Sequence, residues 1–91
     1  GTGLQRDAAN VGIVAPFLRH KVSMVRMAAA DALARMNAQD RVGDLIALLG
    51  PEEPMPNVRL HARKALQELA GHDDYGYDVV AWRKAFDRGN K

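Results

Sequence analysis

One sequence pattern occurs twice in this chain. Residues 25–36 read VRMAAADALARM, and residues 58–69 read VRLHARKALQEL. Met27 and Met36 of the first copy are replaced by leucines in the second, so apolar character is kept where identity is lost. A repeat of about 33 residues with helical periodicity is typical of a solenoid, in which each unit buries its apolar face against its neighbours. The identical pairs are Val25 and Val58, Arg26 and Arg59, Ala29 and Ala62, Ala32 and Ala65, and Leu33 and Leu66.

The second half of each unit also recurs. Residues 11–19 (VGIVAPFLR) align with residues 42–50 (VGDLIALLG), and residues 79–88 repeat the same apolar spacing more weakly, with Trp82 and Phe86 in place of leucines. Apolar residues three and four positions apart predict amphipathic helices, and nothing alternates with the period of a strand. We therefore expect an all-α chain without a sheet, with helices at residues 8–19, 22–37, 41–49, 57–70 and 79–88.

These helices group into two and a half units within a single domain of 91 residues. Residues 1–9 are interpreted as an N-terminal extension and residues 10–19 as a half repeat. Residues 22–49 form one repeat, and residues 56–88 form another whose last helix caps the stack with large rings. The chain starts Gly-Thr-Gly without a methionine, which suggests a piece of a longer protein.

Polar residues and one proline mark the expected helix starts. Ser23, Asp40 and Asp78 can each accept a hydrogen bond from unpaired amide groups of a first helical turn. Pro56 takes the position of Ser23 in the second copy, where its missing amide hydrogen costs no helix hydrogen bond. We expect Ser23, Asp40, Pro56 and Asp78 to begin the second, third, fourth and fifth helices, respectively.

The composition excludes some kinds of chemistry but does not assign the chain to a cellular compartment. The chain has no cysteine, which excludes a disulfide framework and thiolate chemistry. No apolar run approaches the roughly 18 residues needed to cross a membrane, and no signal-peptide pattern is present. The net charge of +2 does not by itself indicate a nucleic-acid partner. The compartment stays open, with some preference for the cytoplasm, and no cofactor is expected.

The repeated pattern Val-Arg-x-x-Ala-x-x-Ala-Leu, followed by a second amphipathic helix, resembles the HEAT repeat, particularly the short bacterial form grouped with phycobilisome-lyase HEAT-like repeats. Residues 71–82 (GHDDYGYDVVAW) look like the closing segment of many bacterial HEAT-repeat chains. The resemblance covers about residues 10–88. It implies an armadillo-type superhelix of helix pairs that acts as an adaptor or scaffold.

Arg26 and Arg59 occupy matching positions and should form a row along the stack. We expect them to pair with carboxylates or backbone carbonyls of the adjacent unit, with a ligand-binding row as the alternative. HEAT repeats often carry an aspartate a few residues before the Val-Arg pair, which can meet the arginine of an adjacent repeat. Here residues 20–24 read HKVSM and residues 54–57 read PMPN, which puts that ladder of salt bridges in question.

Residues 59–64 (RLHARK) form the densest basic stretch of the chain. Arg63 and Lys64 replace Ala30 and Asp31 of the first copy, so the repeat itself does not require them. A solvated helix face is the simplest interpretation. The alternatives are a contact surface for an acidic protein and phosphate binding, although no aromatic residues are interleaved. A basic C-terminal end adds Arg83, Lys84, Arg88 and Lys91.

A polar segment before the last helix contains His72, Asp73, Asp74 and Asp78. Imidazole and carboxylates can bind a divalent ion, but this spacing matches no metal motif. We interpret the segment as a turn whose last aspartate caps the following helix. Ser23, the only serine, is assigned to a helix start rather than to catalysis. We therefore predict neither a metal site nor an enzyme.

Together these patterns predict a right-handed superhelical stack of antiparallel helix pairs, with the first, third and fifth helices lining one face. Gly12 and Gly43 recur at matching positions there, and close packing between helices is the expected reason. The predicted function is a non-catalytic protein-interaction or scaffold module with an unidentified partner. The alternative is a nucleic-acid-associated module that uses residues 59–64 and the basic C-terminal end. The candidate binding surface comprises Arg41, Asp44, Arg59, Arg63 and Lys64.

The first predicted helix is the latter half of a unit whose first helix is missing. Ile13, Val14 and Phe17 then lack part of their cover, because solenoids need capped ends. We favour the interpretation that the chain is the terminal piece of a longer protein. The alternative is that this side pairs with a second copy of the chain.

Overall fold

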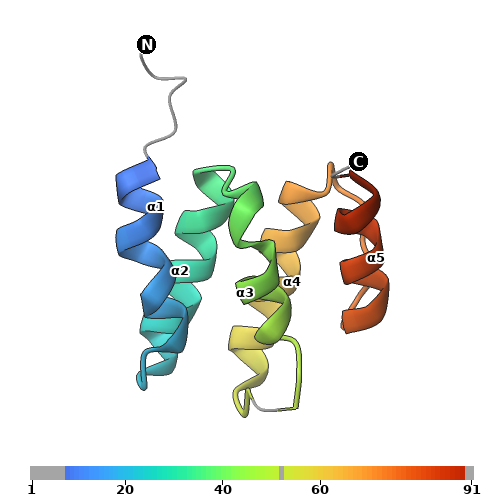
Figure 1. Cartoon of the computed structure of the whole chain (residues 1–91). Coiled ribbons are helices and arrows are strands. Elements are labelled where there is room, and N and C mark those ends of the chain that lie inside the picture. Colours follow the sequence, from blue (N-terminus) through green and yellow to red (C-terminus); the bar gives the residue numbers. More distant parts are fainter. Residues whose placement is uncertain (1–7, 52, 90–91) are drawn as a thin grey trace.

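The computed structural model describes residues 8–51 and 53–89, and all regular secondary structure within these ranges is helical. The prediction of an all-α chain is thus confirmed. Figure 1 shows the helices in chain order. The elements are α1 (Ala8–Val14), η2 (Ala15–Arg19), α2 (Ser23–Arg35), η3 (Gln39–Arg41), α3 (Val42–Ala47), α4 (Pro56–Leu69) and α5 (Val79–Gly89), where η denotes a 3-10 helix.

Two of the predicted helix starts are confirmed. The Asp78 side chain caps α5, because its Oδ1 accepts a hydrogen bond from the backbone N–H of Ala81 at 3.1 Å. Pro56 is the first residue of α4, where its ring presets the helical backbone and no hydrogen bond is lost.

The other two predicted caps were wrong. Ser23 is already the first helical residue of α2, and Val22 precedes it in extended backbone conformation without a side-chain cap. Asp40 lies inside η3, because the chain enters α3 through a 3-10 turn, and its side chain makes no cap to α3. In both cases the polar residue already has helical backbone, so its side chain lies inside the first turn instead of before it.

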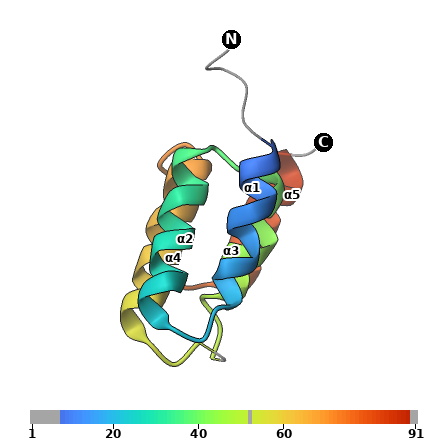
Figure 2. The ribbon, with the colours of Figure 1, turned by 90° about the vertical axis from the view of Figure 1, so that its left-hand side faces the viewer.

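The helices lie in two layers. Figure 2 shows α2 and α4 side by side in one layer and α1, α3 and α5 in the other. The most extensive contact between helices joins α2 to α4, and η2 packs on α2. Helix α3 bridges the layers by packing on α4 and lies next to α5 within its own layer.

The last helix runs in the direction opposite to the one predicted. Figure 1 shows α5 rising in the same direction as α4, so these two helices do not form an antiparallel pair. The reason is residues 71–78, which we call the closing segment. They run back along α4, as the ion pair between Asp74 and Arg63 in the middle of α4 requires. The prediction of antiparallel pairs therefore fails at the C-terminal end.

The core is one hydrophobic cluster shared by both layers. Leu33 of α2, Leu66 of α4 and Trp82 of α5 are fully buried within it. Many of the remaining core residues are alanines of α2 and α4, and their short side chains let these helices approach closely. The repeated alanines therefore explain why α2 and α4 make the largest contact.

Candidate functional site

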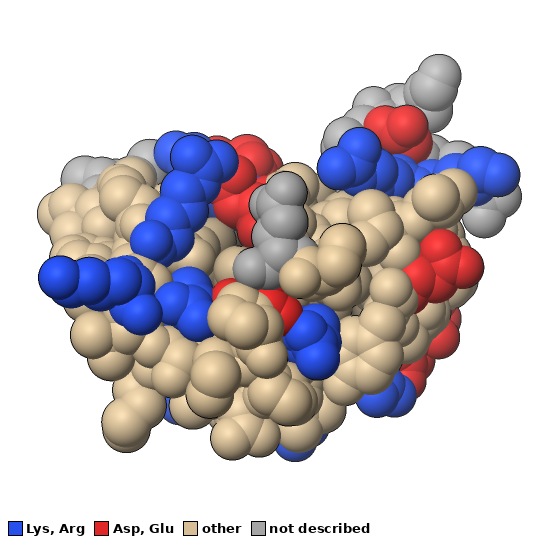
Figure 3. Space-filling view, turned by 90° about the horizontal axis from the view of Figure 1, so that it is seen from below, with Lys and Arg blue, Asp and Glu red and all other residues tan. Residues whose placement is uncertain are grey.

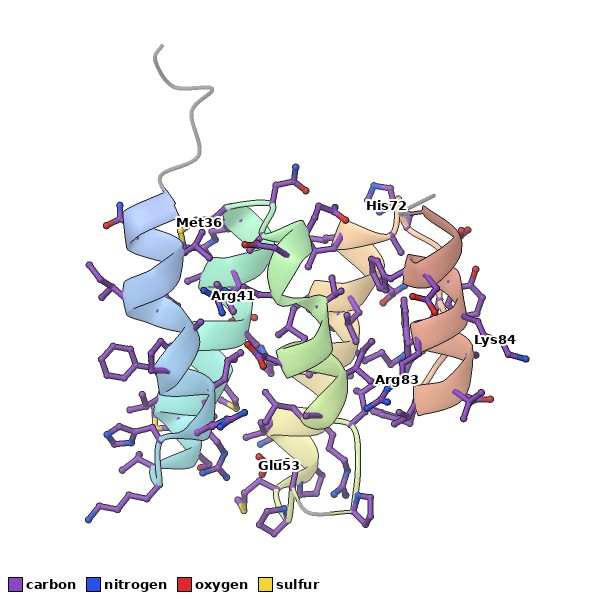
Figure 4. All side chains as sticks on the ribbon, viewed as in Figure 1. Met36, Arg41, Glu53, His72, Arg83 and Lys84 are labelled. Atoms are coloured by element: carbon purple, nitrogen blue, oxygen red, sulfur yellow. The ribbon has the colours of Figure 1, made fainter. Side chains whose placement is uncertain are left out.

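Arg26 of α2 and Glu53, in the loop before α4, form the most buried ion pair among the described residues. The guanidinium group binds the carboxylate with two hydrogen bonds, Nε to Oε1 at 2.7 Å and Nη2 to Oε2 at 2.8 Å. Its third donor, Nη1, reaches the backbone carbonyl of His20 at 2.7 Å. Glu53 is only 4% exposed, and Figure 4 shows it at the loop end of the molecule. This pair ties the first repeat to the second.

The second arginine repeats half of this arrangement. Arg59 Nη1 donates to the backbone carbonyl of Glu53, as Arg26 Nη1 donates to that of His20. The side chains of His20 and Glu53 each accept the backbone N–H two residues later, both at 3.0 Å. Both arginines thus bond to a carboxylate or a backbone carbonyl. The expected partner from the adjacent unit is found for Arg26, which binds Glu53, whereas the carbonyl bound by Arg59 lies in the loop that leads into its own helix.

Glu53 also answers the question about the salt-bridge ladder. No acidic residue occurs within residues 54–57, but Glu53 lies immediately before them and binds Arg26. Its match in the first copy is His20, a residue of different chemistry, so no identity between the copies marks this position. The two positions match in structure instead, because each side chain accepts the backbone N–H of the residue two positions later.

The surroundings of Glu53 shift its pKa in two directions. Burial raises the pKa, but the hydrogen bonds from Arg26 and from the Met55 N–H lower it, and so do the charges of Arg26 and Arg59. The net effect lowers the pKa of Glu53 below its ordinary value, so the carboxylate stays ionised in the folded chain.

The basic stretch on α4 is largely occupied by contacts within the chain. His61 Nδ1 lies 3.0 Å from Asp31 Oδ1 on α2. Arg63 binds Asp74 through Nε at 3.0 Å and Nη2 at 2.6 Å, and its guanidinium group lies 5.3 Å from the ring centre of Tyr77. Lys64 is exposed. Three of the four basic side chains in residues 59–64 are therefore already bonded within the described part of the chain.

Asp74 organises the closing segment. Its carboxylate also accepts the backbone N–H of Gly76 at 2.8 Å. The hydrogen bonds from Arg63 and from this amide lower the pKa of Asp74 to about 2. Among the described residues no group of three or more histidines, aspartates or glutamates could hold a metal ion.

Because the pKa values of Glu53 and Asp74 are lowered, we expect the chain to lose stability in acid. The pKa values of both Glu53 and Asp74 are lower in the folded chain than in the unfolded one. Their contribution to stability is present above the unfolded pKa and is lost as the pH falls through the folded pKa. For Asp74 this window runs from its ordinary value of 3.8 down to about 2. Urea unfolding at several pH values below about pH 5 should show a falling free energy of unfolding. An Asp74→Asn variant should show a smaller fall, and an equal fall in both proteins would contradict the assignment.

A groove opens between α1 with η2 on one side and η3 with α3 on the other. It has a volume of about 380 Å³ and is lined by Gly12, Ala15, Pro16, Arg19, Arg41 and Asp44. Arg41 Nη1 lies 3.9 Å from Asp44 Oδ2, and the Nε of Arg41 is buried without a hydrogen-bond partner. Figure 4 shows Arg41 where α1 and α3 face each other. The groove is therefore a concave surface beside one ion pair, Arg41 with Asp44, and the Nε–H of this arginine has no acceptor.

The two recurring glycines do not serve helix packing. No heavy atom lies within 4 Å of the place where a Cβ would stand on Gly12 or on Gly43. The expectation that these glycines let a neighbouring helix approach closely was therefore wrong. Gly12 instead lines the groove, where the absence of a side chain keeps the surface open.

The five predicted surface residues fall on two separate parts of the molecule. Arg41 and Asp44 belong to the α1–α3–α5 layer and flank the groove. Arg59, Arg63 and Lys64 belong to α4 in the other layer. The structure therefore brings together the first two and keeps the other three apart from them.

Charged residues are scattered over the end of the molecule that carries the turn 20–22 and the loop 51–56. Figure 3 views this end. Lys and Arg atoms gather on its left side, and acidic and uncharged atoms separate them from the basic atoms on the right. A nucleic-acid surface needs several cations that can reach neighbouring phosphates. In this view the basic group on the left does not continue across the end of the molecule.

No protein-family model, curated protein or solved structure matches this chain. None of the helices in the described ranges is both long enough and apolar enough to cross a bilayer.

Proposed function

We propose that this chain is a HEAT-like helical-repeat module that binds a protein partner and catalyses no reaction. The two-layer arrangement and the repeated arginine contacts support the repeat interpretation. In such solenoids each unit contacts its neighbours and one helix layer presents the binding surface. The α1–α3–α5 layer has the open groove, so it is the layer we assign to the partner.

The observation that carries this proposal is the groove lined by Gly12, Arg41 and Asp44. Its shape accommodates a protruding peptide segment, and the partly exposed charged groups of Arg41 and Asp44 beside it can pair with charged or polar groups of a partner. The lining residues include no serine, cysteine or histidine that could act as a nucleophile or general base. A binding role therefore fits this lining better than a catalytic one.

Nucleic-acid binding ranks second. Its proposed surface combines residues 59–64 with the basic C-terminal end. In residues 59–64, Arg59, His61 and Arg63 bond within the chain, so Lys64 is the one basic side chain there without such a bond. At the C-terminal end, Arg83 and Lys84 are exposed, and Lys91 lies outside the described residues. If phosphate contacts nevertheless dominate, affinity should fall steeply between about 50 and 200 mM salt and captured proteins should vanish after nuclease treatment.

The two glycines provide a matched test of the groove. Gly12→Ala and Gly43→Ala should each stabilise the chain by about 0.5–1 kcal/mol, because alanine favours the helix and neither new Cβ meets another atom. Only Gly12 lines the groove, so only its variant should weaken partner binding. The measurement is affinity capture from source lysate, with and without nuclease, using wild type, both variants and Arg41→Ala, together with urea unfolding of each.

We expect one set of proteins to be retained by wild type and by Gly43→Ala and depleted with Gly12→Ala and Arg41→Ala. Equal retention by all four chains would show that the partner does not use the groove. If the captured proteins are lost when the lysate is treated with nuclease, nucleic-acid binding becomes the favoured function.

A further inference from the structure

A second hollow adjoins the groove near the loop 51–56. It has a volume of about 530 Å³. Its apolar lining comes from Leu18, Ala47, Leu48 and Pro54. Arg19 lines both hollows, so the groove and the second hollow meet at this side chain. We call the two hollows together the furrow. It lies between α1 with η2 on one side and η3, α3 and the start of the following loop on the other.

The charges along the furrow do not balance. Its lining includes four basic and two acidic side chains, namely Arg19, Lys21, Arg26, Arg41, Asp44 and Glu53. Both carboxylates already have basic partners, because Glu53 binds Arg26 and Asp44 lies 3.9 Å from Arg41. Arg19 and Lys21 are exposed, and neither has a carboxylate partner among the described residues. The furrow therefore offers two unpaired cations beside an apolar lining.

Basic side chains gather on the side of the molecule that carries α1 and α2. Figure 3 shows Lys and Arg atoms together on the left, where Figure 1 places these two helices. The turn 20–22, which carries Lys21, joins η2 to α2 there. An incoming negative charge is therefore attracted most strongly to the end of the furrow beside this turn.

The position of the furrow within the stack limits what can fill it. Both of its walls belong to the described chain and come from neighbouring elements of the stack. Since each unit of a solenoid contacts only its neighbours, a unit preceding α1 would pack on the side of α1 that faces away from α3. A unit following α5 would likewise pack beyond α5. The furrow therefore accommodates a segment from outside the stack.

We propose that the furrow binds an extended acidic segment of a partner protein, in which carboxylates flank an apolar side chain. The carboxylates pair with Arg19 and Lys21, and the apolar side chain enters the second hollow beside Ala47 and Pro54. This inference rests on the proposed function, because it names the chemistry of the partner that the groove binds.

A nucleic acid fits the furrow less well. Its backbone carries a negative charge at every nucleotide, so phosphates would approach the carboxylates of Asp44 and Glu53 as well as the cations. The residues that line the two hollows include no aromatic ring on which a base could stack. A protein segment can instead place its carboxylates at Arg19 and Lys21 alone and supply the apolar side chain between them.

The test uses three fluorescein-labelled peptides of equal length. The first, GSEELEEPSG, has carboxylates on both sides of a leucine. GSQQLQQPSG replaces the carboxylates by amides, and GSEEGEEPSG removes the apolar side chain. Fluorescence anisotropy at about 20 mM salt, where surface charges are weakly screened, should show that the full chain binds the first peptide about tenfold more tightly than either of the others.

A charge reversal in the chain provides the counter-test. The double variant Arg19→Glu with Lys21→Glu should lose this preference and bind a GSKKLKKPSG peptide more tightly than the acidic one. Both side chains are exposed, so their replacement leaves the core unchanged. The matched control is Arg83→Glu with Lys84→Glu, because these exposed cations lie on α5 and line neither hollow (Figure 4). This control should bind the acidic peptide as wild type does, and circular dichroism verifies that each variant remains helical.

Three peptide results would overturn the proposal. They are equal affinities for the acidic and amide peptides, no binding of the acidic peptide, and a loss of binding in the control variant as large as in the charge reversal. Tighter binding of a labelled oligothymidylate of matched length would also overturn it, because the cations would then serve phosphates.

Capture from source lysate separates this inference from the proposed function. Depletion of the captured proteins by Gly12→Ala, by Arg41→Ala and by the charge reversal, together with the peptide preference, would support both. If Gly12→Ala and Arg41→Ala deplete these proteins while the charge reversal does not, this inference fails and the proposed function stands. If all of these chains capture the same proteins, the proposed function fails and this inference fails with it.

Discussion

Replacement of Glu53 by alanine should lower the free energy of unfolding by about 3 kcal/mol, because it leaves a largely buried arginine without its carboxylate. Arg26 would lose both charge-assisted hydrogen bonds, and the backbone N–H of Met55 would lose its acceptor. The bond from Arg59 to the backbone carbonyl of residue 53 does not involve the removed side chain. The substitution therefore weakens the contact between the first and second repeats.

Urea unfolding followed by circular dichroism measures this effect. Glu68→Ala is the matched control, because Glu68 is an exposed glutamate of α4, and its loss should change stability by less than about 0.5 kcal/mol. The double variant Arg26→Leu with Glu53→Leu should recover most of the stability, since it removes both charges together. If Glu53→Ala is as stable as Glu68→Ala, the pair does not join the repeats.

Truncation of Trp82 should be the most damaging single substitution in the C-terminal half of the chain. Trp82 is fully buried, and its Nε1 donates to the Gly76 carbonyl at 2.7 Å. Its ring meets Tyr75 edge-on at 4.9 Å and stacks with Phe86 at 6.1 Å. Trp82→Ala should cost about 4 kcal/mol, a large fraction of the stability of a small domain.

The indole contacts also predict a graded series. Trp82→Phe keeps an aromatic ring but leaves the Gly76 carbonyl without its donor, so its cost should lie near about 1–2 kcal/mol. Val80→Ala is the control, because Val80 is 62% exposed on the same helix. Circular dichroism is the appropriate signal, since the variants lack the only tryptophan. Equal stability of Trp82→Ala and Val80→Ala would show that α5 does not anchor the closing segment.

Helix positions could be predicted from the sequence because they depend on residues close together in the chain. The spacing of Val58, Ala62, Leu66 and Leu69 marks the buried side of α4, and the structure buries each of them. Arg41 and Asp44 of the predicted binding surface line the observed groove, and their role in binding stays a prediction. The role assigned to Gly12 was wrong, because sequence alone does not show whether a neighbouring helix reaches that position.

The direction of α5 depends on the path of the closing segment, which no periodicity encodes. Asp74 reads as a turn residue in the sequence, yet its bond to Arg63 brings the segment back along α4. Similarly, the basic stretch 59–64 looks like a charged surface until Asp31 and Asp74 are placed beside it. Contacts between residues distant in sequence therefore decide which of these charges remain available to a partner.

The sequence by itself determined that this chain is helical, that its pattern repeats, and which sides of α2 and α4 are apolar. Each of these properties follows from residue spacing within one or two helical turns. Only the tertiary structure decided that Glu53 joins the repeats and that the closing segment lies along α4. These outcomes depend on which helices lie next to each other, because burial and ion pairing are properties of neighbours in space.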